Sequence, residues 1–255
     1  MLQGIDHLVV VVPDLDAAVK TYRDLGFTVV AGGRHTGVGT DNALIAFRDG
    51  SYLELLGFYE PRPDHRWWEP LRRGGGLVDF CLRTDDLAGD AAALRRAGVA
   101  MSELQGRTRR RPDGFEVRWV FAVAGGGHRG VAPFLIADET PREERVPRER
   151  AHANGVSGIG RVTVAVDDLA AVRVWYAQAL GSTGQEIASP ELGAAGVRFS
   201  LGPHTFEFLA PTGAGAIRAW LSARGASPYA ATLVGASRPG PLGLDRTWGA
   251  RLALA

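Results

Sequence analysis

The sequence contains one cysteine, Cys81, among its 255 residues. A single cysteine excludes an internal disulfide framework and a cysteine-based zinc site. Its apolar setting, FCL, favours a buried and unreactive thiol. A long hydrophobic run is also missing, because Asp6 and His7 interrupt the apolar stretch near the N-terminus and no basic region precedes it. We therefore expect neither a signal peptide nor a transmembrane helix, and a cytoplasmic protein.

An excess of one charge is missing as well. The chain carries 29 basic and 28 acidic residues, a formal net charge of +1. No basic excess therefore argues for a nucleic-acid partner, and we expect no membrane partner. The hydrophobic content of 45% is typical of a globular protein, and the length allows one large or two small domains. A homodimer is left open by these properties.

A unit of similar pattern occurs three times in the chain. The three segments are Gly4–Gly26, Gly76–Gly98 and Gly158–Gly181. Each begins with a strand-like apolar run, continues with helical spacing after an aspartate suited to cap a helix, and ends at a glycine. Three more strand-like runs follow each segment, so the repeated unit is predicted to be β-α-β-β-β. Residues 215–255 resemble a fourth unit that has lost its helix and middle strands.

Four stretches carry a resemblance to a known family: GGRHTGVGTDNALIAFRDGSYLEL, RTRRRPDGFEVRWVF, APFLI and HANG. With the repeat, they resemble the glyoxalase-like branch of the vicinal oxygen chelate superfamily, which includes glyoxalase I, bleomycin-resistance proteins and extradiol dioxygenases. The resemblance implies an α+β fold in which paired modules form curled mixed sheets. It predicts a paired-module domain over residues 1–138, a linker over 139–156 with solvated charges, and a C-terminal half over 157–255 whose last module is degenerate.

The resemblance also nominates metal ligands. In this superfamily they come from the first and last strands of each module, and they point into a cup. In the first two units these positions hold His7, Glu54, Asp79 and, by alignment, Leu135. The first three could hold a divalent ion, with manganese, iron or magnesium preferred over a tight zinc site. The alternative is that His7 and Glu54 form a hydrogen-bonded core pair without a metal.

The third unit has lost this pattern. Its corresponding residues are Arg161 and Glu207, and arginine cannot be a metal ligand. We expect these two residues to form a buried ion pair. The cup of the first two units, called here the N-terminal cup, is therefore the predicted functional site.

The stretch AGGRHTGVGTDNALIAF, residues 31–47, is unusual in composition. A strand follows its glycines and no P-loop lysine is present, so it is neither a dinucleotide-binding loop nor a phosphate loop. We expect a hairpin that brings Arg34, His35 and Asn42 to the mouth of the N-terminal cup. The alternative is a hairpin tip in which Asp41 and Asn42 only satisfy the backbone.

A second hairpin, RTRRRPDG, is expected at the same mouth, with Arg118 and Trp119 on its following strand. Two basic hairpins would select an anionic ligand. Trp67 and Trp68 lie in a connection, where they would either cover a pocket or an interface, or plug the bottom of the barrel.

The predicted function is binding of a small anionic or oxygen-rich organic molecule. If the protein is an enzyme, the resemblance implies metal-assisted lyase, isomerase or ring-cleavage chemistry with a manganese, iron, zinc or magnesium ion. In that case His35 and Glu54 are the predicted catalytic residues, and Arg34, Asn42, Arg118 and Trp119 bind the ligand. The rival prediction is a metal-free protein that sequesters its ligand.

Overall fold

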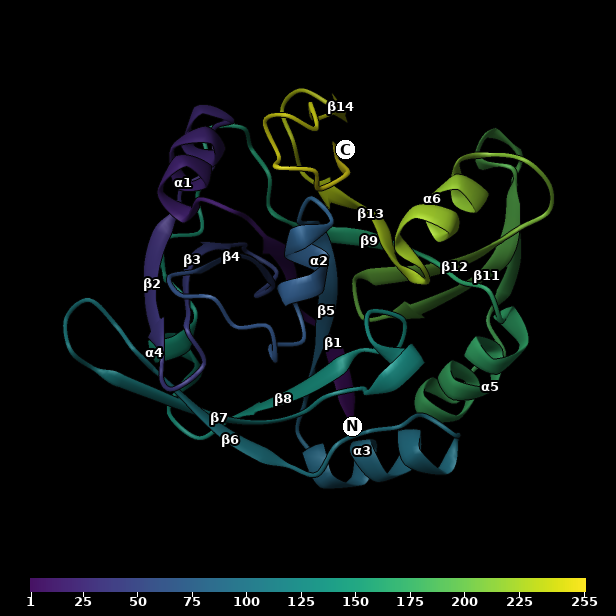
Figure 1. Cartoon of the computed structure of the whole chain (residues 1–255), viewed down its shortest axis with the longest axis horizontal. Helices are drawn as coiled ribbons and strands as arrows, with labels where there is room; N and C mark the ends of the chain where they lie inside the picture. The colour runs from purple at the N-terminus through teal and green to yellow at the C-terminus, as the bar shows by residue number, and fades with distance from the viewer.

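The strands of the protein form two sheets (Figure 1). The computed structural model describes residues 1–255. Eight strands of the N-terminal half close into a barrel in the order β1-β4-β3-β2-β6-β7-β8-β5. Their bounds are β1 (Leu2–Val11), β2 (Val30–His35), β3 (Thr40–Ala46), β4 (Tyr52–Phe58), β5 (Gly76–Thr84), β6 (Gln105–Arg110), β7 (Glu116–Ala122) and β8 (Phe134–Asp138).

The barrel is built from two β-α-β-β-β units, as the sequence predicts. Helix α1 (Leu15–Asp24) follows β1, and helix α3 (Leu87–Arg96) follows β5. Asp14 and Asp86 cap these helices, each accepting a backbone N–H three residues on at 3.0 Å. A short helix, α2 (Trp68–Arg72), connects the two units.

The two units meet along their first strands and along their second strands. Strand β1 is antiparallel to β5 of the other unit and parallel to β4 of its own. Strands β2 and β6 close the other side, where Arg34 pairs with Arg110 and His35 with Arg109. The predicted α+β fold with curled mixed sheets is therefore confirmed.

The C-terminal half forms an open seven-stranded sheet. Its order is β10-β11-β12-β9-β13-β15-β14. The elements are β9 (Gly158–Ala165), α5 (Leu169–Leu180), β10 (Gln185–Ser189), β11 (Ala194–Leu201), β12 (His204–Pro211), α6 (Ala216–Arg224), β13 (Ser227–Val234), β14 (Gly240–Pro241) and β15 (Leu252–Leu254). Strand β13 pairs with β9 and carries only the short β15 and β14 beyond it, so the last module is degenerate.

The barrel and the open sheet share one hydrophobic core of 43 buried residues. The rings of Phe80 on β5 and Phe206 on β12 lie 5.9 Å apart. Helices α3 and α5 lie side by side in the lower part of Figure 1. Burial of this common apolar surface holds the two halves together.

The connection between the sheets is more structured than predicted. It contains helix α4 (Arg142–Arg145), whose Arg145 is 2% exposed. The prediction of solvated charges is therefore wrong for this residue, because Arg145 donates to the buried carboxylate of Asp6. Two short 3-10 helices, Gly126–His128 and Pro190–Leu192, complete the elements. None of the helices has the length and apolar character needed to cross a membrane.

Candidate functional site

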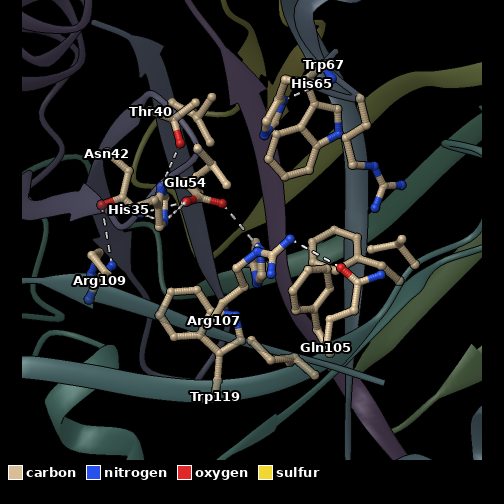
Figure 2. Close-up of a pocket in the computed structure, with 18 of the residues that line it drawn as sticks. His35, Thr40, Asn42, Glu54, His65, Trp67, Gln105, Arg107, Arg109 and Trp119 are labelled. Carbon is tan, nitrogen blue, oxygen red and sulfur yellow. Dashed lines mark hydrogen bonds and ion pairs between the residues drawn. The ribbon is translucent and has the colours of Figure 1, made fainter. Parts of the chain in front are cut away.

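The N-terminal cup is a cavity of about 430 Å³ inside the barrel. Strands β1 to β4 supply His7, His35, Asn42 and Glu54, and β7 supplies Trp119. Figure 2 shows His35, Asn42, Glu54 and Trp119 around the cavity. These five predicted site residues lie together because residues of one parity on each strand face the inside of a barrel. The roles assigned to them stay predictions.

Arg34 and Arg118 lie outside the cup, so the prediction that they line its mouth is wrong. Arg34 precedes the inward-facing His35, and Arg118 precedes the inward-facing Trp119. Adjacent side chains on a strand point to opposite faces. Arg34 and Arg118 are therefore exposed on the outside, where Arg34 lies 4.7 Å from the ring centre of Tyr59.

His7 is held in place by its neighbour Asp6, a residue that the sequence analysis did not assign. The β1–β5 register shifts between Ile5 and His7, an irregularity typical of a β-bulge. His7 Nδ1 lies 2.7 Å from Asp6 Oδ1, and both side chains are buried. Burial alone would raise the pKa of the Asp6 carboxyl, but the guanidinium groups of Arg145 and Arg142 hold it well below its usual value. Asp6 is therefore an anion that accepts the Nδ1 proton of His7 and leaves Nε2 available at the cup.

Glu54 lies between two imidazoles. Its Oε2 is 3.5 Å from His7 Nε2, and its Oε1 is 3.7 Å from His35 Nε2. Asn42 Nδ2 donates to Glu54 Oε1 at 2.6 Å. Burial would raise the pKa of Glu54, but the two histidines and the Asn42 hydrogen bond lower it below its usual value. The cup thus contains a buried, ionised carboxylate. Figure 2 shows Glu54 beside His35 and Asn42.

His35 is oriented by Thr40, whose Oγ1 lies 2.9 Å from His35 Nδ1. Burial lowers the pKa of His35 to about 4, and the neighbouring Glu54 only partly opposes this. The imidazole is therefore neutral at pH 7. Position 32 of this hairpin requires glycine, because a Cβ on Gly32 would lie 2.0 Å from Asn42 Oδ1. Gly32 makes room for the side chain that positions Glu54.

Asp79 does not join the predicted metal set. Its Oδ2 lies 2.7 Å from Nη2 of Arg66 and accepts the indole N–H of Trp67 at 2.9 Å. Its Oδ1 accepts the backbone N–H of Phe80. Asp79 is not among the residues that line the cup. The ligand atoms of His7, Glu54 and Asp79 do not all lie within 4.8 Å of one another, so the predicted set does not fit a metal ion.

The fourth ligand position is occupied by Phe134, and the alignment to Leu135 is wrong. In the first unit, Glu54 pairs with Val9, which lies two residues after His7. In the second unit, Phe134 pairs in the same way with Cys81, which lies two residues after Asp79. Phe134 is therefore the residue equivalent to Glu54. Phe134 lines the cup, and phenylalanine cannot bind a metal.

One other cluster contains three groups that metal ions can bind. The ligand atoms of Asp6, His7 and Cys81 lie within 4.8 Å of one another. However, the Asp6 oxygens already accept from Arg142, Arg145 and His7. Burial raises the pKa of the Cys81 thiol well above its usual value, so the thiolate is disfavoured. This chemistry fits a structural hydrogen-bond network better than a metal site.

Arginines dominate the charge of the cup, and the sequence analysis missed most of them as site residues. Five arginines and two carboxylates line it: Arg62, Arg66, Arg107, Arg109 and Arg145, with Glu54 and Asp64. Arg62 binds Asp64, and Arg145 binds Asp6. The arginine-rich hairpin gave a signal for Arg107 and Arg109, whereas Arg66 lies in a connection with no pattern of its own.

Aromatic rings form the walls around these charges. Trp67 and Trp119 both line the cup, together with Phe121 and Phe134. Trp68 does not line it and packs against Phe58 at a ring distance of 5.1 Å. Trp67 is therefore part of the wall of the cup, whereas Trp68 is not.

The ion pair predicted in the C-terminal half is present, but only its glutamate is buried. Arg161 Nη1 lies 3.4 Å from Glu207 Oε1, and the Arg161 side chain is 44% exposed. Arg198 approaches the same oxygen more closely, at 2.6 Å. Arg161 is therefore the weaker of two partners of Glu207.

Comparison with known proteins identifies similar chains. The profile described as a glyoxalase-like domain matches residues 5–180. A hypothetical protein from Staphylococcus aureus is similar over 100% of this chain and 99% of its own, with a TM-score of 0.74 and 15% identity. A mutant 4-hydroxymandelate synthase from Streptomyces coelicolor is similar over 92% of this chain and 71% of its own, with a TM-score of 0.62 and 18% identity. At these identities the likeness concerns the fold. No curated protein sequence matches the chain.

Proposed function

The chain belongs to the glyoxalase-like domain family of the vicinal oxygen chelate superfamily, and from this premise we propose that its N-terminal cup binds a small anionic organic molecule. The observation that carries the proposal is the set of arginines left without an acidic partner on the cup wall. Arg107 binds only Gln105 and a backbone carbonyl. Arg109, 3% exposed, binds Asn42 and a backbone carbonyl, and its Nε has no partner. Guanidinium groups that line a cavity without an acidic partner favour an anion.

The volume and the walls of the cup are consistent with a small ligand that has an apolar part. A cavity of about 430 Å³ lies in the range of small-molecule sites, and its aromatic lining favours a ligand with an apolar part. Metal-assisted lyase, isomerase or ring-cleavage chemistry is less well supported. Asp79 is paired with Arg66, and Phe134 takes the fourth ligand position. The proposal therefore follows the metal-free alternative.

A screen by thermal shift tests the proposal. Small carboxylates are compared with their neutral amides, and hits are measured by calorimetry. We expect the carboxylates to bind better, and Arg107→Met to weaken them about tenfold or more, since a hydrogen bond to a charged group contributes roughly 1.5–3 kcal/mol. Arg34→Met, which changes an arginine outside the cup, is the matched control and is expected to leave affinity unchanged. Equal binding of carboxylates and amides would contradict the proposal.

Proton transfer is a second candidate function, and Glu54 is the observation that favours it. An ionised, buried carboxylate that faces a ligand cavity can act as a general base. His7 and His35 next to it can exchange protons with it. The test is exchange of deuterium from heavy water into a bound carboxylate that carries a C–H bond next to its carbonyl. Exchange is expected with the wild type and not with Glu54→Gln.

A further inference from the structure

Arg66 occupies an unusual position for a charged residue. It lies in the connection between β4 and α2, yet its side chain is only 14% exposed and lines the N-terminal cup. Its guanidinium carbon lies 5.4 Å from the ring centres of both Trp67 and Phe134. Such contacts with aromatic faces stabilise a desolvated cation.

The contacts of Arg66 involve two of the four positions that hold metal ligands in this superfamily. Asp79 is its ion-pair partner at 2.7 Å, and Phe134 is one of its aromatic contacts. The residues at the other two positions, His7 and Glu54, lie 3.5 Å from each other. The guanidinium of Arg66 is therefore a positive charge next to the positions at which relatives would hold a metal ion.

The ion pair with Asp79 leaves part of the Arg66 guanidinium without an acceptor. Nη2 lies 2.7 Å from Asp79 Oδ2 in the ion pair, whereas the buried Nη1 has no partner. Buried donors without partners are rare in folded proteins and costly. An oxygen-rich group entering the cup would satisfy them.

We infer that Arg66 takes the place of a metal ion as the fixed cation of the cup. Its ligand is the carboxylate group of a small aromatic acid. The inference rests on the proposed function and names its ligand class. The donors of Arg66 select the carboxylate, because a guanidinium can bind both carboxylate oxygens. The rings of Trp67, Trp119 and Phe121 select a flat apolar group next to it. Asp79 neutralises the guanidinium while the cup is empty.

Two variants with opposite expected effects test this role. The probes are benzoate and phenylacetate, with benzamide and phenylacetamide as neutral controls, measured by calorimetry on the full chain. Arg66→Met removes the cation and is expected to weaken carboxylate binding at least tenfold. Asp79→Asn removes the internal counter-charge and is expected to strengthen it several-fold. Arg72→Met, on the exposed side of α2, is the control and should leave binding unchanged.

The opposite signs separate a binding role from a structural one. If Arg66 and Asp79 only stabilised the fold, both variants would weaken binding, and this result would overturn the inference. Unchanged binding in Arg66→Met would overturn it too.

The two proposals can fail separately. If carboxylates bind and are lost in Arg107→Met but not in Arg66→Met, the proposed function stands and only the inference fails. If neither the wild type nor Asp79→Asn distinguishes carboxylates from amides, both fail. Should Asp79→Asn not fold, Trp67→Phe removes the indole N–H that Asp79 Oδ2 accepts and leaves that oxygen to Arg66 alone. This variant is then expected to weaken the binding of carboxylates more than that of the amides, and an equal effect on both would overturn the inference.

Discussion

Asp6 and His7 are consecutive residues of one strand, and yet their side chains are hydrogen-bonded, with His7 Nδ1 2.7 Å from Asp6 Oδ1. A regular strand would direct them to opposite faces. The irregular register of β1 against β5 at this point brings them together. Because Asp6 fixes the Nδ1 side of the ring, Nε2 faces Glu54 at 3.5 Å. The hydrogen-bond network of Asp6 with Arg142 and Arg145 thus determines the orientation of the His7 ring in the cup.

This network makes Arg145 a large contributor to stability. Its guanidinium donates to both oxygens of Asp6, at 2.8 and 2.9 Å, and to the hydroxyl of Tyr52 at 2.8 Å. Arg145→Met would leave buried Asp6 with less compensation, and breaking a buried pair costs roughly 3–5 kcal/mol. Urea unfolding should show a loss of this size. Arg142→Met is the control and should cost clearly less, because Arg142 is 21% exposed and leaves Arg145 in place. Equal losses would mean that Arg145 is no more important than its exposed neighbour.

His35 makes stability depend on pH. Its pKa is about 4 in the folded protein, against an ordinary value of 6.5, because burial disfavours the imidazolium. Between these values the unfolded chain binds a proton that the folded chain does not, so stability falls as the pH is lowered from 6.5 to 4. A shift of this size corresponds to about 3 kcal/mol. Denaturant unfolding at pH 7 and at pH 4.5 should show a larger acid loss in the wild type than in His35→Gln. Parallel losses would contradict the assignment.

Strand positions could be predicted from the sequence, whereas connections could not. The alternation of side chains along strands brings His7, His35 and Glu54 into one cup, and a repeated unit predicts which strands supply them. The same alternation places Arg34 outside, where the composition of the hairpin had suggested a role. Arg66 reaches the cup from a connection through long-range packing against Asp79, and no local pattern encodes such a contact.

Arg161 is expected to contribute little to stability. Its pair with Glu207 is 3.4 Å long and its side chain is 44% exposed, so solvent screens the attraction. Glu207 also keeps Arg198 at 2.6 Å. Arg161→Ala should therefore lower the free energy of unfolding by less than about 1 kcal/mol. Arg198→Ala is the matched comparison and should cost more. A loss of several kcal/mol in Arg161→Ala would show that the pair is buried in solution.

We expect no divalent metal ion to bind at His7, Glu54 and Asp79 in the wild-type protein. A divalent ion at these residues would have to displace Arg66 from Asp79, which lies 2.7 Å away, and would find a phenylalanine at the fourth position. Loss of a buried ion pair opposes this exchange. Titration of the wild-type protein with Co²⁺, followed by visible absorption and equilibrium dialysis, should therefore detect no stoichiometric site in the cup. Arg66→Met removes the ion-pair partner of Asp79, and this variant is expected to bind Co²⁺ more tightly than the wild type because the carboxylate no longer has to be freed from a guanidinium. One equivalent bound by the wild type and lost in both Glu54→Gln and Asp79→Asn would instead establish the metal set that the superfamily pattern implies.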